Sequence, residues 1–352
     1  MKVLFISRAY PPVIGGIEKQ NFEIYNALSN ILDIKLVANT KGKRFLPVFI
    51  IISLYKLIKL RNDYDLILLG DGVLSILSFI VKLFSKKKIV CIVHGLDLTY
   101  QNFFYKKLWL NIFIKENDRF IAVGKATVAE AIKLGISKEK IIFIPNGVNI
   151  ENVYSNNKDI ANLLGFTPKG PILLTLGRLI KRKGVAWFIE NVMTELDDSI
   201  IYLIAGHGPE RNKITQSIES FNLKNKVIYL GSVSEEEKLL LLSSADIFIQ
   251  PNIPVENDIE GFGLVILEAA IQNTFVIASK LEGLNDSITH GKNGVLVPPK
   301  NANDYIKEIK SLLSNKDQLK IKSQQARNFV IENYSWDKIA EKYKEVLLEK
   351  SN

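Results

Sequence analysis

The sequence predicts an α/β protein of two domains, each built on a parallel, doubly wound sheet. Its 352 residues are enough for two domains of ordinary size. Short apolar runs alternate with longer segments of helical pattern, which is typical of strand–helix–strand units. The alternation is interrupted at 154–170, where Asn, Ser, Lys and Gly are frequent, as they are in linkers. We therefore predict domains at 1–152 and 153–334, followed by a last helix within 335–352.

The apolar runs define the expected strands, and the segments between them define the expected helices. In the first domain the strands are expected at 3–7, 34–38, 66–69, 89–93, 120–123 and 141–144. The helices of this domain are expected at about 18–30, 47–61, 73–84, 103–116 and 125–134. In the second domain the strands are expected at 172–176, 200–205, 227–231, 247–250, 275–278 and 295–297. Helices at about 301–313, 316–333 and 336–349 are expected to end the chain.

The composition is that of a globular protein, with 47% hydrophobic and 24% charged residues. The single cysteine, Cys91, excludes an intrachain disulfide framework and fits a reducing compartment, where it would serve core packing. The longest apolar stretch, 46–55, is about half as long as a membrane-spanning helix needs to be. These observations predict a cytoplasmic protein.

The excess of positive over negative charge comes from the first domain. Residues 1–150 hold 22 Lys and Arg against 11 Asp and Glu, whereas the remainder holds 24 against 26, so the net charge of +9 comes from the first part. Two segments, 41–61 and 78–88, are basic and apolar together, and 103–110 is a weaker third. They fit the surface of an anionic bilayer, or ordinary buried helices with solvated lysine ends. Nucleic acid is the poorer partner because no recognised binding motif is present.

Two features of the first domain are candidates for ligand binding. Gly15 and Gly16 follow the first expected strand and precede a helix, so their backbone either approaches a ligand or makes a tight turn. His94 stands at the end of an apolar strand and is followed by Gly95. Ligands collect at the carboxyl ends of parallel strands, which makes His94 a candidate for catalysis or for contact with a sugar. The alternative is a structural role, which is the more frequent one for a lone histidine. No His or Cys cluster surrounds it, so zinc is not expected.

The second domain begins with a basic, glycine-flanked turn. Arg178 and Lys183 lie between Gly177 and Gly184, directly after a strand. Arginine supplies a planar fork and lysine a point charge, which is what a diphosphate needs; a basic surface turn is the alternative. The next strand repeats the pattern with Gly206.

Two carboxylates eight residues apart, Glu260 and Glu268, flank Gly261-Phe262-Gly263. The apolar run that follows predicts a helix starting near Gly263, with Glu268 one to two turns inside it. The amide end of that helix suits a phosphate, and the two acids suit hydroxyl groups on either side. A sugar nucleotide has this pattern. The alternative is an exposed loop acid and an unrelated glutamate on the helix surface.

Taken together and in this order, the motifs resemble those of the family-four, or group 1, glycosyltransferases of the GT-B type. The motifs are Gly15-Gly16-Ile17-Glu18, His94-Gly95, Pro145-Asn146-Gly147-Val148, Gly177-Arg178-Leu179 with Lys183-Gly184, Gly206-x-Gly208-Pro209, and Glu260-x7-Glu268. The resemblance covers nearly the full length. It implies two Rossmann-like domains facing a central cleft, with the last helix, 335–352, packing back on the N-terminal domain.

The resemblance also implies roles for individual residues. Arg178 and Lys183 would bind the donor diphosphate, Glu268 the ribose, and Glu260 the hydroxyls of the transferred sugar. His94 would lie against that sugar and complete the catalytic set of His94, Glu260, Arg178 and Lys183. The remaining donor-binding positions would be Gly15, Gly16, Gly206, Phe262, Gly263 and Leu264.

The implied activity is a retaining, metal-independent transfer from a nucleotide sugar to a lipid-linked or surface-polysaccharide acceptor, with no cofactor. The protein is then expected in the cytoplasm, either free or bound peripherally to the cytoplasmic face of a membrane. Two alternatives stay open: a GT-B epimerase or phosphorylase, and a non-catalytic protein that binds sugar nucleotides or acts as a membrane scaffold.

Overall fold

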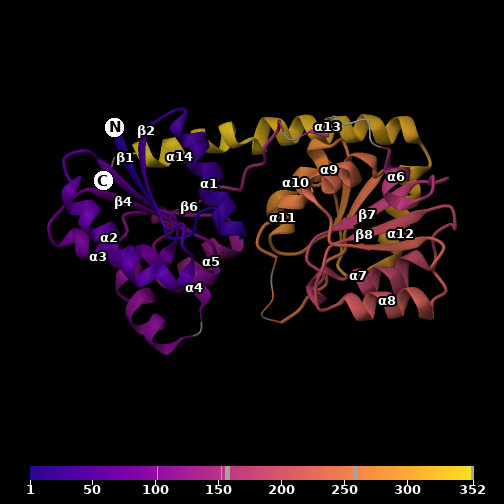
Figure 1. The fold of residues 1–352 in the computed structure, drawn as a ribbon, viewed down its shortest axis with the longest axis horizontal. Coiled ribbons are helices and arrows are strands. Elements are labelled where there is room, and N and C mark those ends of the chain that lie inside the picture. The colour runs from indigo at the N-terminus through magenta and orange to yellow at the C-terminus, as the bar shows by residue number, and fades with distance from the viewer. Residues whose placement is uncertain (101, 152, 155–158, 257, 259, 350–352) are drawn as a thin grey trace. The chain divides into compact units, whose positions relative to one another are not determined.

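The structure, a computed structural model, describes residues 1–100, 102–151, 153–154, 159–256, 258 and 260–349. The chain divides into two compact units, drawn in Figure 1. The first unit is Met1–Gly147 with Trp336–Asn352, and the second is Val148–Ser335. The stretch expected to be a linker contains a short helix, α6 (Ile160–Leu164), whose start is capped by the Asp159 carboxylate accepting from the Ala161 amide at 3.1 Å.

The first unit contains a sheet of six parallel strands in the order β2-β1-β3-β4-β5-β6. Its strands are β1 (Lys2–Ser7), β2 (Asp33–Ala38), β3 (Leu66–Leu69), β4 (Lys88–Val93), β5 (Arg119–Ala122) and β6 (Ile141–Phe143). The strands in the middle of the sheet are buried almost throughout. This explains why they read as continuous apolar runs rather than alternating ones.

Helices of the first unit cover the sheet on both faces. They are α1 (Gly16–Ser29), α2 (Leu46–Lys59), α3 (Ser75–Lys82), α4 (Leu96–Thr99) and α5 (Lys125–Lys133), with 3-10 turns at Lys43–Phe45, Gly72–Leu74 and Lys138–Lys140. The prediction of one helix over 103–116 is wrong. The segment forms a π-helical turn at Tyr105–Leu110 and a 3-10 turn at Phe113–Glu116. A tertiary contact accompanies the break, since the Trp109 indole donates to the Val73 carbonyl at 2.8 Å.

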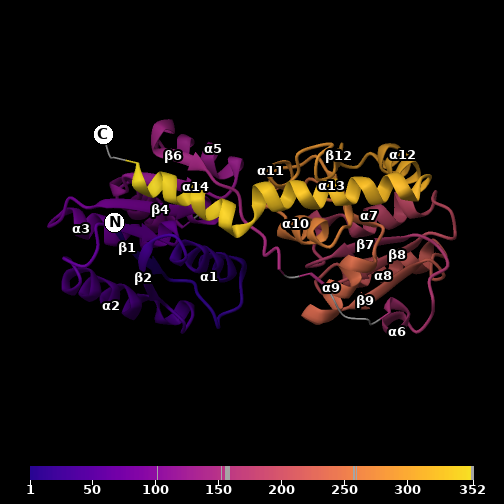
Figure 2. The same cartoon turned by 90° about the horizontal axis from the view of Figure 1, so that it is seen from above.

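The last helix, α14 (Trp336–Leu348), belongs to the first unit and lies beside α1 in both ribbon views (Figures 1 and 2). Its buried positions recur with helical spacing on one face: Ile339, Ala340, Tyr343, Val346 and Leu347. They share a core with Ile24 and Leu28 of α1 and with the sheet. The helix is therefore held by the burial of an apolar stripe.

The second unit repeats the architecture with a parallel sheet in the order β12-β11-β10-β7-β8-β9. Its strands are β7 (Ile172–Leu176), β8 (Ile201–Ala205), β9 (Val227–Gly231), β10 (Ile247–Gln250), β11 (Phe275–Ser279) and β12 (Val295–Val297). Besides α6, its helices are α7 (Val185–Phe188), continued as a π-helical turn at Ile189–Met193, α8 (Arg211–Ser220), α9 (Glu235–Ser244), α10 (Leu264–Ile271), α11 (Leu284–Ser287), α12 (Ala302–Leu313) and α13 (Lys316–Tyr334).

Strand order determines where each unit binds ligands. In parallel α/β sheets the binding crevice lies at the carboxyl ends of the strands, where the direction of strand addition reverses. The reversal falls between β1 and β3 in the first unit and between β7 and β10 in the second. The segments that follow these four strands are therefore the places to look for a site.

The packing of α14 leads to a prediction about stability. Ile339 is fully buried, so Ile339→Ala should lower the free energy of unfolding of the first unit by about 2–5 kcal/mol. Ile321, which is 58% exposed on α13, supplies the control. Ile321→Ala should change the free energy of unfolding by no more than about 0.5 kcal/mol. Urea unfolding followed by circular dichroism measures both. Equal effects of the two substitutions would contradict the packing described for α14.

Candidate functional site

Five residues that follow β7 and β10 form a charged cluster at the switch point of the second unit. This Glu260 cluster consists of Arg182, Lys183, Asn252, Asp258 and Glu260. Lys183 Nζ lies 2.6 Å from Glu260 Oε2, and an Arg182 guanidinium N–H donates to the same oxygen. Asn252 Nδ2 donates to it as well, at 3.0 Å, while Arg182 Nε lies 2.9 Å from Asp258 Oδ1. One carboxylate oxygen thus receives three donors.

The local backbone brings these side chains together. A 3-10 turn at Lys181–Lys183 ends at Gly184, whose φ of 66° is left-handed and favours glycine. A Cβ on Gly184 would collide with the carbonyl oxygen of Pro251, so glycine lets the two loops touch. The Ile253 amide donates to the Arg182 carbonyl at 2.8 Å and joins the loops directly. The short turn also separates its side chains: Arg182 is buried, whereas Lys181 is exposed.

Burial and charge act against each other in the Glu260 cluster. Burial raises the pKa of the Glu260 carboxyl, but Lys183 and Arg182 lower it by more, so the pKa lies below its ordinary value. Burial lowers the pKa of the Lys183 ammonium, Glu260 raises it, and neighbouring Arg182 and Arg178 lower it further, for a net decrease. Within the cluster, Arg182 and Lys183 are balanced by the Glu260 and Asp258 carboxylates, so positive charge in excess of the acids comes from Arg178 beside it. A third cation at this place attracts a further anion.

Arg178 follows β7 directly and is exposed. No ion pair among the described residues involves it, yet it lies close enough to Lys183 to lower that residue's pKa. Its guanidinium therefore adds to the positive charge of the Glu260 cluster from the solvent side. A planar fork in this position can bind two phosphate oxygens at once.

Glu268 lies elsewhere in the second unit. It is in the second turn of α10 and its carboxylate is 3.3 Å from Lys238 Nζ of α9, which also contacts Glu235 at 2.6 Å. Lys238 and Glu235 line a hollow of about 210 Å³ together with residues that follow β7, β8 and β9: Gly177, Gly206, Ser232, Val233 and Ser234. Gly206 thus borders this hollow through its backbone. The hollow and the Glu260 cluster both lie at the carboxyl edge of the sheet, on either side of β7.

The loop before α10 contains Gly261-Phe262-Gly263, where donor-binding positions were expected. Gly263 caps the helix with a left-handed φ of 76°, which a residue with a side chain rarely adopts. Leu264 is the first residue of the helix, as expected. The Phe262 ring is buried and packs near the Tyr334 ring at 6.4 Å between centroids, so only its backbone is available to a ligand.

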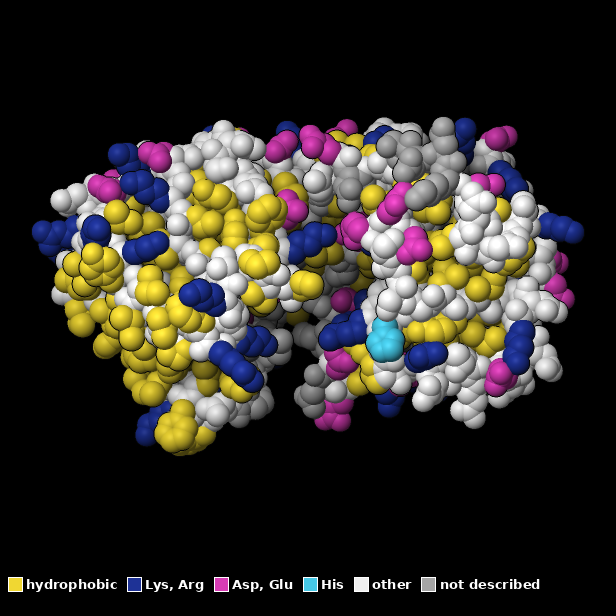
Figure 3. Space-filling model, viewed as in Figure 1, with side chains coloured by type: hydrophobic (Ala, Val, Ile, Leu, Met, Phe, Trp, Pro, Cys, Tyr) yellow, Lys and Arg dark blue, Asp and Glu magenta, His cyan; other side chains and the backbone are white. Residues whose placement is uncertain are grey.

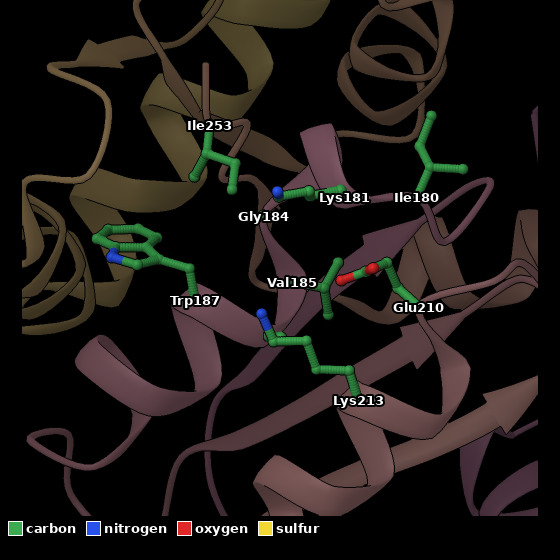
Figure 4. A pocket seen from close by; sticks show the side chains of 9 residues that line it. Ile180, Lys181, Gly184, Val185, Trp187, Glu210, Lys213 and Ile253 are labelled. Carbon is green, nitrogen blue, oxygen red and sulfur yellow. The ribbon is translucent and has the colours of Figure 1, made fainter. Parts of the chain in front are cut away.

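A second hollow borders the 3-10 turn but differs in size and lining. Figure 4 shows Lys213, Glu210 and Trp187 around it, together with Lys181 of the turn. Its volume of about 40 Å³ holds little more than water. None of the five residues of the Glu260 cluster lines it.

In the first unit, His94 follows β4 and is fixed at two points. Its Nε2 lies 2.9 Å from the Gly70 carbonyl oxygen, which can only accept, so this nitrogen carries a proton and donates it. Its backbone amide donates to Asp97 Oδ1 at 3.0 Å, and the Gly72 amide donates to Asp97 Oδ2 at 2.9 Å. Asp97 therefore ties the segment after β4 to the segment after β3.

A buried ion pair lies at the switch point of the first unit. Arg8, after β1, has its Nε 2.7 Å from Asp71 Oδ2, and Asp71 is fully buried. Burial raises the pKa of Asp71 by more than Arg8 and His94 lower it. Gly15 and Gly16 are at the start of α1, where the Glu18 side chain folds back over Gly15. Both glycines thus open a helix, as expected.

Of the expected residues, the structure brings Lys183 and Glu260 into contact and places Arg178 nearby, whereas Glu268 has a separate partner. His94, Gly15 and Gly16 belong to the first unit. Sequence reasoning missed residues that support the site: Arg8, Asp71, Asp97, Arg182, Lys238 and Asn252. Charged residues directly after buried strands would have indicated Arg8 and Asp71. Nothing in the sequence distinguished Arg182 from the lysines on either side.

No group of three or more His, Cys, Asp and Glu side chains able to hold a metal occurs in the described part of the chain. The sequence contains an Asp63-Tyr64-Asp65 triplet, a D-x-D pattern. It precedes β3 and so lies at the amino edge of the sheet. Asp63 pairs with Lys35 at 3.3 Å, and Asp65 accepts from the Lys2 amide at 2.8 Å. The triplet therefore contacts the amino edge of the first sheet, opposite the carboxyl ends of its strands.

Comparisons with known proteins match both units. The family model described as Glycosyl transferases group 1 matches residues 156–329, and the model described as Glycosyltransferase Family 4 matches residues 3–152. An uncharacterized glycosyltransferase of Methanocaldococcus jannaschii is 26% identical over 98% of both chains. The N,N'-diacetylbacillosaminyl-diphospho-undecaprenol alpha-1,3-N-acetylgalactosaminyltransferase of Campylobacter jejuni is 29% identical over 64% of this chain and 58% of its own.

Among solved structures, the Anabaena protein HepE in complex with UDP and glucose superposes with a TM-score of 0.73 over 99% of both chains, at 19% identity. At this identity the likeness concerns the fold. The two parallel six-stranded sheets with helices on their faces are the GT-B architecture, so the predicted fold class is confirmed.

The Glu260 cluster predicts a pH-dependent stability. Glu260→Gln leaves Lys183 without its anion and Arg182 with Asp258 alone. The free energy of unfolding of the second unit should therefore fall by about 3–5 kcal/mol near neutral pH. Because the folded-state pKa of Glu260 is lowered, its stabilisation is present above the unfolded pKa of about 4.3 and is lost as the pH falls through the folded value. The difference between wild type and variant should therefore shrink in acid.

Urea unfolding across the acid range measures this difference. Glu256→Gln, which changes an exposed acid of the same loop, is the matched control and should differ little from wild type at every pH. A deficit of Glu260→Gln that stayed constant down to the lowest pH would show that Glu260 is not held as a carboxylate by its neighbours.

Proposed function

Since the chain belongs to the group 1 glycosyltransferases, we propose that it is a retaining enzyme that transfers a sugar from a nucleoside diphosphate sugar to an acceptor. The observation that carries the proposal is the Glu260 cluster, in which one carboxylate is shared by Arg182 and Lys183 with exposed Arg178 beside them. Arg178 adds a positive charge that the Glu260 and Asp258 carboxylates do not balance, which is what a diphosphate leaving group requires.

The donor would lie along the carboxyl edge of the second sheet. Its diphosphate would bind Arg178 and Lys183 and face the amide end of α10 at Phe262, Gly263 and Leu264. Its nucleoside would occupy the hollow bordered by Gly206 and 232–235, which Lys238 connects to Glu268. The Glu268 carboxylate would then accept hydroxyl groups of the ribose.

Glu260 would have two tasks. Its carboxylate holds Lys183 in place and is itself kept ionised by Lys183 and Arg182, so it remains an acceptor for sugar hydroxyls. His94, oriented by Gly70 and Asp97 in the first unit, would contact the transferred sugar. Gly15 and Gly16 would border the donor phosphate or the acceptor.

In the proposed reaction, the bond between the anomeric carbon and the diphosphate oxygen breaks and a bond from the acceptor oxygen to the same carbon forms. The acceptor proton passes to the departing phosphate, and attack on the same face retains the configuration. Negative charge grows on the diphosphate, where Arg178 and Lys183 stabilise it more in the transition state than in the ground state. We propose that no metal or organic cofactor takes part.

The acceptor is proposed to be a lipid-linked or surface-polysaccharide intermediate. The Campylobacter relative is named for a diphospho-undecaprenol substrate, and the first unit carries the excess of basic residues. The protein would then work in the cytoplasm, bound peripherally at an anionic membrane face.

Incubation with a panel of nucleotide sugars and acceptors, with and without EDTA, tests the proposal. We expect nucleoside diphosphate and a glycoside of retained configuration to appear only when an acceptor is present, at the same rate with EDTA. Isomerised donor formed without acceptor would identify an epimerase, and sugar phosphate formed from inorganic phosphate would identify a phosphorylase. Either product would overturn the proposal.

Arg178→Ala should lower kcat/KM for the donor roughly 10²–10³-fold, because one charge-stabilising group is removed from the leaving diphosphate. Lys181→Ala, which removes an exposed cation from the same loop, is the control and should stay within a few-fold of wild type. Steady-state kinetics with the preferred donor measure both. Comparable losses in the two variants would mean that the loop contributes only general positive charge.

His94→Ala should lower kcat by roughly 10²-fold, since a group positioned at the sugar is lost. The nucleoside diphosphate should still bind with unchanged affinity, because its proposed contacts lie in the second unit. Turnover assays and calorimetric titration with the nucleoside diphosphate separate the two effects. Weakened nucleotide binding with normal kcat would contradict a sugar-contacting role.

A further inference from the structure

Helix α2 (Leu46–Lys59) carries apolar side chains on both of its faces. Phe49, Ser53 and Leu57, four residues apart, are buried against the first unit. The opposite stripe is Val48, Ile51, Tyr55 and Ile58, which are 47%, 68%, 62% and 53% exposed. Their spacing of three and four residues aligns them along the outer side of the helix. A surface helix normally presents polar residues there, so this stripe needs another partner.

The stripe continues onto the neighbouring element. Leu83 and Phe84, at the end of α3, are 74% and 50% exposed, and Phe84 lines a hollow together with Ile58 of α2. Figure 3 shows hydrophobic side chains gathered over the region of α2 and α3, with Lys and Arg at the margin. We call this surface the α2 face: Val48, Ile51, Ile52, Tyr55, Ile58, Leu83 and Phe84.

The two segments that carry the α2 face are rich in cations and contain no acids. Residues 41–61 and 78–88 contain ten Lys and Arg and no Asp or Glu. Lys56, Lys59, Arg61 and Lys86 are exposed. The first unit as a whole has 26 Lys and Arg against 15 Asp and Glu, whereas the second has slightly more acids than bases. The charge is therefore concentrated on the unit that carries the apolar stripe.

The hollow beside the face combines both properties. It is lined by Ile58 and Phe84, by the ring of Tyr64, and by Arg61 and Lys87. Lys87 Nζ stacks over the Tyr64 ring at 4.1 Å. Apolar side chains bordered by cations suit the boundary between acyl chains and phosphate headgroups. A second copy of the chain would bring like charges together, so an anionic bilayer is the better match.

We propose that the α2 face inserts its apolar stripe into the headgroup boundary of an anionic membrane, with Lys56, Lys59, Arg61 and Lys86 contacting lipid phosphates. None of the described helices combines the length and apolar character required to cross a bilayer, and α2 would lie in the plane of the membrane surface. This proposal deepens the proposed function. It rests on that function only where it concerns the lipid-linked acceptor.

Vesicle flotation tests the proposal with the full chain. Wild type should float with vesicles of phosphatidylcholine and phosphatidylglycerol, float weakly with phosphatidylcholine alone, and be partly released by high salt. Ile51→Glu should weaken binding about tenfold or more, since an inserted side chain becomes charged. Lys56→Ala should weaken it about fivefold and reduce the salt dependence.

Ile321→Glu is the matched control, because it makes the same change at a 58% exposed isoleucine of the second unit. It should float like wild type. Tyr55→Trp gives an independent reading: its emission should shift to shorter wavelength with anionic vesicles. Flotation of Ile51→Glu equal to wild type, or no flotation of wild type at any salt, would overturn the proposal.

Sedimentation measurements test whether a second copy of the chain, rather than a membrane, covers the α2 face. A dimer of the wild-type chain that Ile51→Glu converts to monomer would show that a second copy covers the α2 face, and would likewise overturn the proposal. Flotation involves no donor sugar. Membrane binding without any transfer activity would leave the surface assignment intact and refute the proposed function, and transfer to a water-soluble acceptor without flotation would do the reverse.

Discussion

The second unit depends on a carboxylate that is buried among cations. The Glu260 carboxylate has two basic groups on one oxygen, and it would be costly to bury if any of its partners were missing. Arg182, Lys183 and Asn252 satisfy it, and Asp258 balances Arg182 from the other side. The arrangement holds the loop after β7 against the loop after β10. Arg178, beside the cluster, adds a positive charge that these two acids do not balance.

The position of this cluster follows from the way the sheet is built. Strands are added on one side of β7 and then on the other, so the segments after β7 and β10 meet at the switch point of the sheet. The first unit has the same reversal between β1 and β3, where it places Arg8 and Asp71. In both units a buried ion pair joins the two segments at the reversal. Rigid loops at these points are a condition for orienting substrates to within a fraction of an ångström.

The two units divide their chemistry by charge. The second unit is nearly neutral overall and brings Arg182 and Lys183 together at the carboxyl edge of its sheet, near Arg178. The first unit is strongly basic, and several of its exposed cations are in the segments that carry the apolar stripe on α2. A localised cluster selects a compact anion such as a diphosphate, whereas cations spread around an apolar surface select an extended one. This difference is the physical basis for the proposals that the second unit binds the donor and that the first unit contacts a membrane.

Much of the fold could be predicted because buried parallel strands appear as uninterrupted apolar runs, which most strands of the described residues follow. An exception is β2, where Lys35 interrupts the apolar residues. The segment 103–116 could not, since tertiary contacts such as Trp109 with Val73 accompany its break into two turns. At the site, Arg178, Lys183, Glu260 and Glu268 stand out because glycines and strand ends flank them.

The sequence by itself determined the class of fold, the two-unit organisation, the basic first unit and the residue types available for binding an anion. These properties depend on local pattern and composition. Only the tertiary structure decided that Arg182 rather than Lys181 turns inward to Glu260, that Glu268 pairs with Lys238, and that the outer stripe of α2 is exposed. Each of these depends on which segments distant in the chain come to lie side by side, and that is settled by packing and strand order rather than by neighbours in the sequence.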